Sequence, residues 1–303
     1  MIAFIDSHRD SISCGLKWGV EPICAVLQFA PSTYRENKNR KPSARSVRDE
    51  QLKPLITKVF DDNYRVYGAE KIWEQLLRDD VTVARCTVER LMSDLGIEGT
   101  RRGKRFVVTT ESDPLAERPK DFVKRKFAAS APNRLWVADL TYVRTLAGWV
   151  YVAFVIDVFS RKFIGWKVST SLHSDIALDA LEMAFRDRDD CEGVVHHSDR
   201  GVQYLSIRYS DRLVEAHATA SVGTKGDSYD NALMESHNGL YKWELILRRD
   251  DWRDAAHVEW ETLCYVDWFN NRRLHGANGM VPPVELEAAY YRVINSADML
   301  VTQ

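Results

Sequence analysis

Long apolar runs are absent from the 303-residue sequence. No stretch approaches the roughly 20 consecutive apolar residues that a membrane-spanning helix needs, so we expect no membrane segment. The first ten residues, MIAFIDSHRD, are too few and too acidic for a signal peptide. Both observations argue against a secreted or membrane-anchored protein, and we expect the chain in the cytoplasm.

Paired cysteines are also missing. The five cysteines are scattered and contain no CxxC spacing, so neither a zinc ribbon nor a disulfide framework is indicated. We expect isolated, reduced thiols, as is usual in a cytoplasmic protein. No internal repeat or low-complexity tract appears in the sequence.

The sequence lacks the overall positive charge that nucleic-acid-binding proteins often carry, because its net charge is −2. The average hides a local asymmetry: between Tyr34 and Lys58, eight Lys or Arg residues stand against three acids. This asymmetry favours phosphate contacts in the N-terminal third, although solvated helix faces would give the same pattern. The basic residues that we expect to contact DNA are Arg85, Arg90, Arg101, Arg102, Lys104 and Arg105.

The first hundred residues have helical periodicity broken by short turns. Apolar residues line one face of segments 69–79 and 84–96, and Gly96 stands where a helix C-cap is expected. Two helices joined by a tight turn beside basic segments are typical of a helix-turn-helix unit, although a plain helical bundle has the same period. We predict an all-α DNA-binding region at 1–106 and a linker at 107–132, where the periodicity is lost among three prolines.

The pattern after residue 132 is that of an α/β domain. Segments 135–145, 148–160 and 161–170 are rich in β-branched and aromatic residues and are joined by short turns, which predicts three antiparallel strands. Further predicted elements are a helix at 175–185, a buried strand just before His196, a helix at 207–215, a strand at 218–222 and a helix from about 231. We predict one mixed sheet with helices on both faces, a core at 133–290 and a tail at 291–303.

Three carboxylates are distinguished by their positions. Asp139 lies inside an apolar strand, where a charge is costly unless it is paired or bound to a metal. Asp199 follows the buried strand, and strand ends in α/β sheets often hold catalytic residues. Glu235 lies on the next helix. Its spacing predicts that it shares one polar stripe with Asn231, Asn238 and Lys242.

Each of these carboxylates taken alone also has a structural explanation. A strand Asp can pair with a neighbouring cation, an Asp after a strand commonly caps a turn, and a helix Glu is usually a surface residue. Asp157, a further strand carboxylate, precedes a hairpin turn and is expected to cap that turn. The order of strand Asp, strand-end Asp and helix Glu favours a common site for Asp139, Asp199 and Glu235.

Longer motifs point to a known family. They are WVADLTYV, YVAFVIDVFSRKFIGW, HHSDRGVQY, SVGTKGDSYDNALMESHNGLYKWEL and WFNNRRLHGANGMVPPVE, which lie between about Leu135 and Glu285, together with RVYGAEKIW and RLMSDLGI nearer the N-terminus. In these motifs, and in the 35 residues that separate Asp199 from Glu235, the sequence resembles the DDE transposases of bacterial insertion sequences, in the retroviral-integrase superfamily.

The resemblance implies an RNase-H-like catalytic core with Asp139, Asp199 and Glu235 as its acidic triad. Phosphodiester cleavage needs an activated nucleophile and a stabilised leaving oxygen, and two Mg²⁺ ions about 4 Å apart supply both. Because Mg²⁺ prefers oxygen ligands, the same three carboxylates are the expected metal ligands, with Mn²⁺ as a substitute ion. The DNA contacts expected around them are Lys242, Arg200, His197 and Asn231. His197 and Arg200 are expected to touch DNA phosphate or to orient the carboxylates, with a purely structural role as the alternative, whereas His196 is expected to pack or hydrogen-bond within the sheet.

The resemblance also implies partners. We expect a transposase that cuts and joins DNA at the terminal inverted repeats of its element and in target DNA, as a homo-oligomer in the bacterial nucleoid. Neither 51–60 nor 69–78 sustains the heptads of a coiled coil, so we expect an upstream-frame product, supplied as a frameshift fusion, to pair the element ends. Two alternatives remain: a nuclease or integrase that mobilises no element, and a DNA-binding relic with an inactive core.

Overall fold

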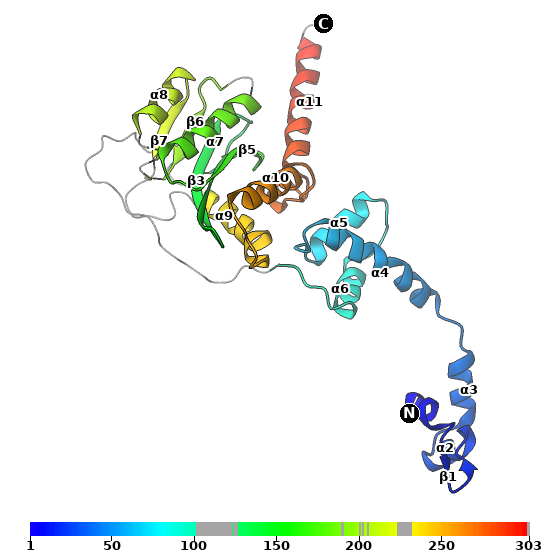
Figure 1. Cartoon of the computed structure of the whole chain (residues 1–303). Coiled ribbons are helices and arrows are strands. Elements are labelled where there is room, and N and C mark those ends of the chain that lie inside the picture. Colours follow the sequence, from blue (N-terminus) through cyan, green and yellow to red (C-terminus); the bar gives the residue numbers. More distant parts are fainter. Residues whose placement is uncertain are drawn as a thin grey trace. The chain divides into compact units, whose positions relative to one another are not determined.

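The computed structural model describes residues 1–100, 123, 127–188, 191–199, 201, 203–204, 206–222 and 232–301, with residues 297–301 described by their backbone alone. Contacts divide the chain into two compact units, Met1–Leu55 and Ile56–Gln303. Figure 1 gives the element labels used below. No helix in the described part of the chain is both long and apolar enough to cross a bilayer.

The first unit is a small helical body with a core of its own. Its helices are α1 (Ile2–His8), α2 (Val20–Val26), α3 (Pro31–Asn39) and the start of α4 (Ala44–Asp62). The core consists of Ile5, Ile23, Cys24 and Tyr34. A two-stranded hairpin, β1 (Ile12–Ser13) and β2 (Leu16–Lys17), separates α1 from α2 in the sequence and was not predicted by the pattern of residues.

The second unit begins with the end of α4 and contains the predicted helix pair, α5 (Ala69–Arg78) and α6 (Arg85–Asp94). Both helices lie within the expected segments and pack against each other. Trp73 Nε1 donates to the Val83 carbonyl at 2.8 Å, which fixes the connection between them. Gly96 has a φ of +65° just after α6, a conformation that glycine adopts without the strain of a side chain.

Contacts inside the second unit link the α4–α5 connection to the C-terminal helices. Trp268 Nε1 donates to Asn63 Oδ1 at 3.0 Å, and the Leu274 amide donates to the Tyr67 hydroxyl at 2.7 Å. The predicted linker, 107–132, lies mostly outside the described residues, so its bounds and those of the regions beside it stay predictions.

The second unit is built around one mixed five-stranded sheet. Its strands are β3 (Leu135–Thr145), β4 (Gly148–Asp157), β5 (Phe163–Ser169), β6 (Val195–Ser198) and β7 (Thr219–Val222). They lie in the order β5-β4-β3-β6-β7. The pairs β3–β4 and β4–β5 are antiparallel, as predicted, whereas β6 runs parallel to both β3 and β7. Because Ala138 pairs with Ser198, the parallel register brings Asp199 level with Asp139.

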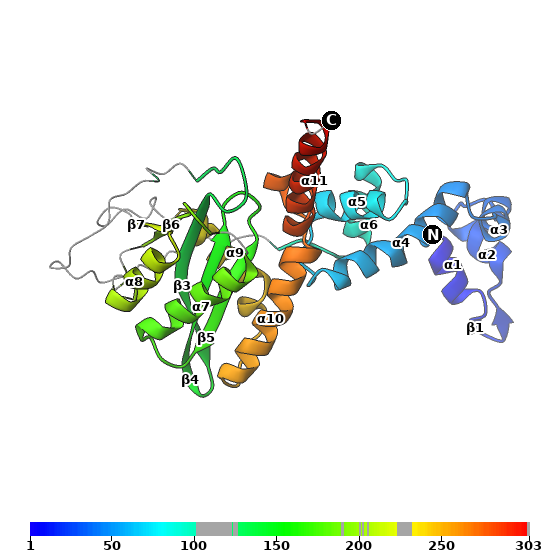
Figure 2. The same ribbon diagram turned by 90° about the horizontal axis from the view of Figure 1, so that it is seen from above.

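Helices cover both faces of the sheet. α7 (Ser174–Asp187) packs on β4 and β5, and its residues share a core cluster with Ala153 and Val155 of β4. Phe154, which points to the opposite face, packs against Tyr241 of α9 (Ala232–Glu244). The remaining helices are α8 (Ile207–Glu215), η2 (Ile246–Arg248), α10 (Ala255–Asn271), η3 (Gly276–Asn278) and α11 (Pro283–Val301). α11 leads away from the sheet towards the C-terminus (Figure 2).

One prediction about an element needs correction. The strand expected to end before His196 instead comprises Val195–Ser198, so both histidines lie inside β6. They are accommodated because each finds a polar partner: His196 Nε2 lies 2.9 Å from the Tyr209 hydroxyl, and His197 Nδ1 lies 2.9 Å from Ser221 Oγ. α11 continues past residue 291 as far as Val301, and the bounds of the C-terminal tail stay a prediction.

Candidate active site

Asp139 lies in the middle of β3, on the face that α9 covers. Its Oδ1 accepts a hydrogen bond from the Leu140 amide at 2.8 Å, and its Oδ2 accepts one from Asn238 Nδ2 at 2.9 Å. Burial, followed by the negative charge of Asp199 and then that of Glu235, raises the pKa of Asp139 well above its usual value. The Leu140 amide and Lys242 oppose this increase. The chain therefore holds the Asp139 carboxylate near the negative charges of Asp199 and Glu235.

Asp199 directly follows β6, beside Asp139. Its Oδ1 accepts a hydrogen bond from the Gly201 amide at 2.8 Å. Burial raises its pKa, against lowering by that amide and by His197. A Cβ on Gly201 would lie 3.0 Å from Asp199 Oδ1 and 2.9 Å from Gln203 Oε1. Only glycine therefore lets the backbone approach the carboxylate this closely without displacing these side chains.

α9 contributes three polar residues towards Asp139. Glu235 lies in the first turn of α9 and is exposed. Partial burial raises its pKa, and its negative charge raises the pKa of Asp139. Asn238, one turn later, donates to Asp139. Lys242 follows after another turn, and its pKa is lowered by burial but raised by the charge of Asp139. The predicted stripe is thus found for these three residues, whereas Asn231 lies outside the described residues.

Asn238 was not among the site residues predicted from the sequence. Its side chain is buried, and its Oδ1 has no hydrogen-bond partner among the described residues although Nδ2 is bound to Asp139. An unpaired buried oxygen is unusual enough to require an explanation, such as an absent ion or water. The sequence placed Asn238 on the polar stripe, three residues after Glu235 on the same face of the helix, without assigning it a role in the site.

The composition of the site fits a hard divalent cation. Its donors are carboxylate and amide oxygens, which Mg²⁺ prefers, and a cation would relieve the repulsion that raises the pKa of Asp139. No group of three or more His, Cys, Asp or Glu side chains is already arranged to hold a metal ion in the part of the chain that the structure describes. Asp139, Asp199 and Asn238 are the residues that could hold such an ion on the core side, and Glu235 could hold it from α9.

The two histidines before Asp199 are both buried in the sheet, each only 1% exposed. Burial lowers the pKa of His196 to about 3, so this residue is neutral and packs as predicted, with its ring at an angle to Tyr209. The His197 ring packs edge-on against Phe127, at a centroid distance of 5.8 Å. Arg200 lies outside the described residues.

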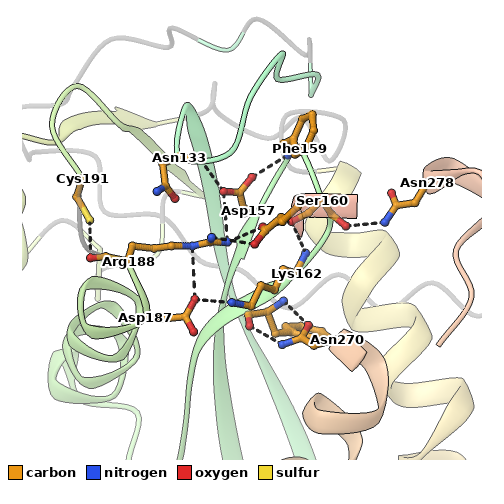
Figure 3. Close-up of polar contacts among 12 residues, drawn as sticks. Asn133, Asp157, Phe159, Ser160, Lys162, Asp187, Arg188, Cys191, Asn270 and Asn278 are labelled. Carbon is orange, nitrogen blue, oxygen red and sulfur yellow. Dashed lines mark hydrogen bonds and ion pairs between the residues drawn. The ribbon is translucent and has the colours of Figure 1, made fainter. Parts of the chain in front are cut away.

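Asp157 has surroundings of the opposite kind (Figure 3). It accepts backbone hydrogen bonds from Asn133 at 2.8 Å and Phe159 at 2.9 Å, which confirms its predicted role at the turn after β4. Arg188 lies 3.6 Å from it and donates two hydrogen bonds, at 2.9 and 2.7 Å, to Glu287 of α11. The negative charge of Asp157 is therefore balanced by Arg188 within the fold.

The basic residues predicted for DNA binding have different local settings. Arg85 lies at the start of α6 and pairs with Glu89 at 2.9 Å and with Glu70 at 3.3 Å. Arg90 pairs with Asp94 at 3.4 Å on the same helix. Exposed pairs of this kind contribute little to stability and do not prevent these residues from exchanging partners. Arg101, Arg102, Lys104 and Arg105 lie outside the described residues.

Comparison with protein families divides the chain in the same order. A model of an HTH-like domain matches residues 47–105, and two models of an integrase core domain match residues 129–228 and 217–283. Among solved structures, the HTLV-2 integrase catalytic core domain in complex with magnesium is similar over 52% of this chain and 99% of that chain, at 15% identity and a TM-score of 0.41. The simian T-cell lymphotropic virus intasome gives 12% identity and a TM-score of 0.45, over 77% of this chain and 74% of that chain.

Three relatives are similar over most of their length. The transposase for insertion sequence element IS629 of Shigella sonnei is 49% identical, over 99% of this chain and 99% of that protein. A protein for insertion sequence element IS986/IS6110 of Mycobacterium tuberculosis is 54% identical, over 88% of this chain and 97% of its own. The transposase for IS904 of Lactococcus lactis is 31% identical, over 82% of this chain and 98% of that protein. The chain belongs to the family of insertion-sequence transposases, with an HTH-like domain ahead of an integrase core of RNase-H-like fold.

Proposed function

We propose that this transposase cuts and joins DNA strands with Asp139, Asp199 and Glu235 as the ligands of a divalent cation pair. The observation that carries the proposal is geometric: the parallel register of β3 and β6 brings Asp199 level with Asp139, and Asn238 of α9 donates to Asp139 at 2.9 Å. The negative charges of Asp199 and Glu235 also raise the pKa of Asp139, and acids held together in this way often mark a catalytic or metal site.

The protein's own contribution is to hold the carboxylates in place. The Leu140 amide and Asn238 fix Asp139 from two sides, and the Gly201 amide fixes Asp199. Two Mg²⁺ ions, or Mn²⁺ as substitutes, would activate the attacking oxygen and stabilise the leaving 3′ oxygen when bound to these carboxylates. The neutral Asn238 adds an oxygen without adding charge.

The DNA contacts belong to the same proposal. Lys242 would neutralise a phosphate next to the reacting one, since it lies on α9 within electrostatic range of Asp139. Arg200 and Asn231 would contact the backbone nearby, and His197 would act on the carboxylates from within the sheet. The HTH-like domain would bind element ends through Arg85, Arg90, Arg101, Arg102, Lys104 and Arg105.

The assembly on DNA is the remaining part of the proposal. The substrates are the terminal inverted repeats of the element and a double-stranded target in the nucleoid, and a homo-oligomer would hold two ends. No sustained heptad occurs in 51–60 or 69–78, which supports a requirement for the upstream-frame product as a frameshift fusion. A two-plasmid transposition assay with and without the fused segment tests this requirement, and full activity of the 303-residue chain alone would contradict it.

The test of the carboxylates uses Asp139→Asn, Asp199→Asn and Glu235→Gln, with Glu259→Gln as the matched control because Glu259 is also an exposed helix residue. We expect each of the first three to lower cleavage and joining of element-end DNA by at least about 10³-fold, since metal ions supply several kcal/mol of stabilisation to the transition state. Mn²⁺ binding should weaken in the same variants. Joining at a near-normal rate by any one of them would remove that residue from the site, and the control should behave as wild type.

A further inference from the structure

Two aromatic rings lie between two cations where α9 meets the outer end of the β3–β4 hairpin. Lys242 Nζ lies 4.5 Å from the centroid of the Tyr142 ring. Tyr142 meets Trp149 edge-on, at 5.3 Å between centroids and an interplanar angle of 81°. The Arg144 guanidinium lies 5.1 Å from the centroid of Trp149. We refer to Lys242, Tyr142, Trp149 and Arg144 as the aromatic track.

The position of the track follows from the sheet. β6 pairs with β3 only from Leu135 to Ala138, so the later part of β3 has no strand on that side among the described residues. Tyr142 and Arg144 are two positions apart and therefore point to the same face. Arg144 pairs across the hairpin with Trp149, which keeps these side chains together. Asp139 points to the other face, which α9 covers, and Lys242 reaches Tyr142 from α9 one turn after Asn238, the residue that donates to Asp139.

The track leaves part of an aromatic ring open to solvent. Trp149 is 47% exposed. Neither Lys242 nor Arg144 forms an ion pair with any residue that the structure describes. An exposed aromatic ring flanked by cations is a feature with which proteins bind single-stranded nucleic acid, because bases stack on rings and phosphates pair with cations.

The lining of a hollow beside Trp149 favours a base over a phosphate. The hollow is lined by Thr145, Trp149, Tyr151, Thr170 and Asp254, among others. Asp254 is the N-cap of α10 and accepts a hydrogen bond from the His257 amide at 2.9 Å. Its negative charge disfavours a phosphate in the hollow, whereas an uncharged base could enter it beside Trp149. The phosphates would then lie towards Lys242 and Arg144.

We propose that the aromatic track holds an unpaired nucleotide of the DNA strand next to the cutting site, with its base stacked on Trp149 and its flanking phosphates on Lys242 and Arg144. This inference rests on the proposed function, because Lys242 connects the track to the carboxylates. It adds a specificity for frayed or single-stranded DNA at the element end that the carboxylates alone do not provide.

The test measures binding of the full chain to two element-end DNAs of equal length, one blunt and one with unpaired nucleotides beside the cut. Binding is measured without divalent ions, so the outcome is independent of whether the three carboxylates bind metal. We expect Trp149→Ala to weaken binding of the unpaired substrate by about 10-fold, within the range for loss of one base–aromatic stack, and to leave the blunt substrate nearly unchanged. Trp149→Phe should retain most of the affinity.

The control is Trp260→Ala, because Trp260 is a 64% exposed tryptophan on α10 outside the track. A 2-aminopurine base at the unpaired position should be quenched by the wild-type protein and by Trp260→Ala, but not by Trp149→Ala. Equal weakening of both substrates, or no weakening of either, would overturn the stacking proposal, with circular dichroism used to verify that each variant is folded.

Discussion

Two groups of acids on one sheet differ in what neutralises them. Asp157 and Glu287 face the guanidinium of Arg188, and two backbone amides complete the shell of Asp157. Asp139 instead faces Asp199 and Glu235, with an asparagine and one backbone amide as its hydrogen-bond donors. Burial raises the pKa of both Asp139 and Asp157, so burial alone does not distinguish them.

The difference lies in the sign of the neighbouring charges. Around Asp157 the chain supplies its own cation, and the result is a structural connection between β4, the end of α7 and α11 (Figure 3). Ser160 extends the connection by donating to Glu287 at 2.5 Å. Around Asp139 the chain gathers negative charge, which Lys242 of α9 opposes without forming an ion pair with Asp139. Acids whose charge is balanced by a cation of the chain, such as Asp157 and Glu287, stabilise the fold. Acids that lie near one another, such as Asp139 and Asp199, favour the binding of a cation.

The largest effect on stability should follow from removing the cation of the structural group. Arg188→Ala leaves Asp157 and Glu287 buried without a counter-charge, and breaking such a buried pair costs about 3–5 kcal/mol. Urea unfolding of the full chain measures this loss. Replacing Arg188 and Glu287 together by apolar residues should recover much of it. A loss below about 1 kcal/mol for Arg188→Ala would show that the group does not stabilise the fold.

The next effect concerns the backbone under Asp199. Gly201→Ala places a Cβ 3.0 Å from Asp199 Oδ1, so the carboxylate should shift by a few tenths of an ångström. Because a misplacement of about 1 Å costs roughly 10²-fold in rate, we expect a smaller loss, of up to about 10-fold, in strand cleavage with little change in unfolding. The control is Gly68→Ala, because a Cβ on Gly68 would meet no atom within 4 Å and cleavage should be unaffected. Gly193 is unsuitable as a control because its φ of +73° would strain any side chain. Normal cleavage by Gly201→Ala would contradict the close fit.

A smaller effect with an informative sign concerns pH. The pKa of Asp139 is raised in the folded state, so its contribution to stability is greatest below its unfolded value near 3.8 and is lost as the pH rises through the folded value. In the presence of a chelator, Asp139→Asn should therefore gain stability relative to wild type as the pH rises from about 4 towards 7. Thermal unfolding across this pH range measures the difference, and Mg²⁺ should reduce it. A difference that falls with pH would reverse the assignment.

The smallest effect on stability is expected for the exposed pairs of the HTH-like domain. Arg85→Ala removes pairs with Glu70 and Glu89 that are half exposed, so unfolding should change by less than about 0.5 kcal/mol. DNA binding should nevertheless weaken, and the slope of log affinity against log salt should decrease by about 1 if Arg85 contacts a phosphate. An unchanged slope would remove Arg85 from the interface. Lys58→Ala serves as the comparison, because Lys58 also forms an exposed ion pair, with Asp62 on α4.

The sequence by itself determined the elements whose residues repeat with the period of the structure they form. β3 matches its predicted bounds and β5 lies within the predicted segment, because alternation and β-branched residues mark strands. α5, α6 and α8 match because their apolar residues follow the helical period. The same local reasoning placed Asp139 inside a strand and Glu235 on a helix, and it assigned Asp157 to a turn, since all three depend on neighbours within a few residues.

Only the tertiary structure decided which of these residues meet. Asn238 reaches Asp139 across 99 positions, and Arg188 reaches Glu287 across another 99. Periodicity carries no information about such partners. β6 was misplaced for the same reason: two histidines look unsuited to a buried strand until Tyr209 and Ser221 satisfy their ring nitrogens from other elements. A buried polar group is stable only with its partner, and the partner is chosen by the fold.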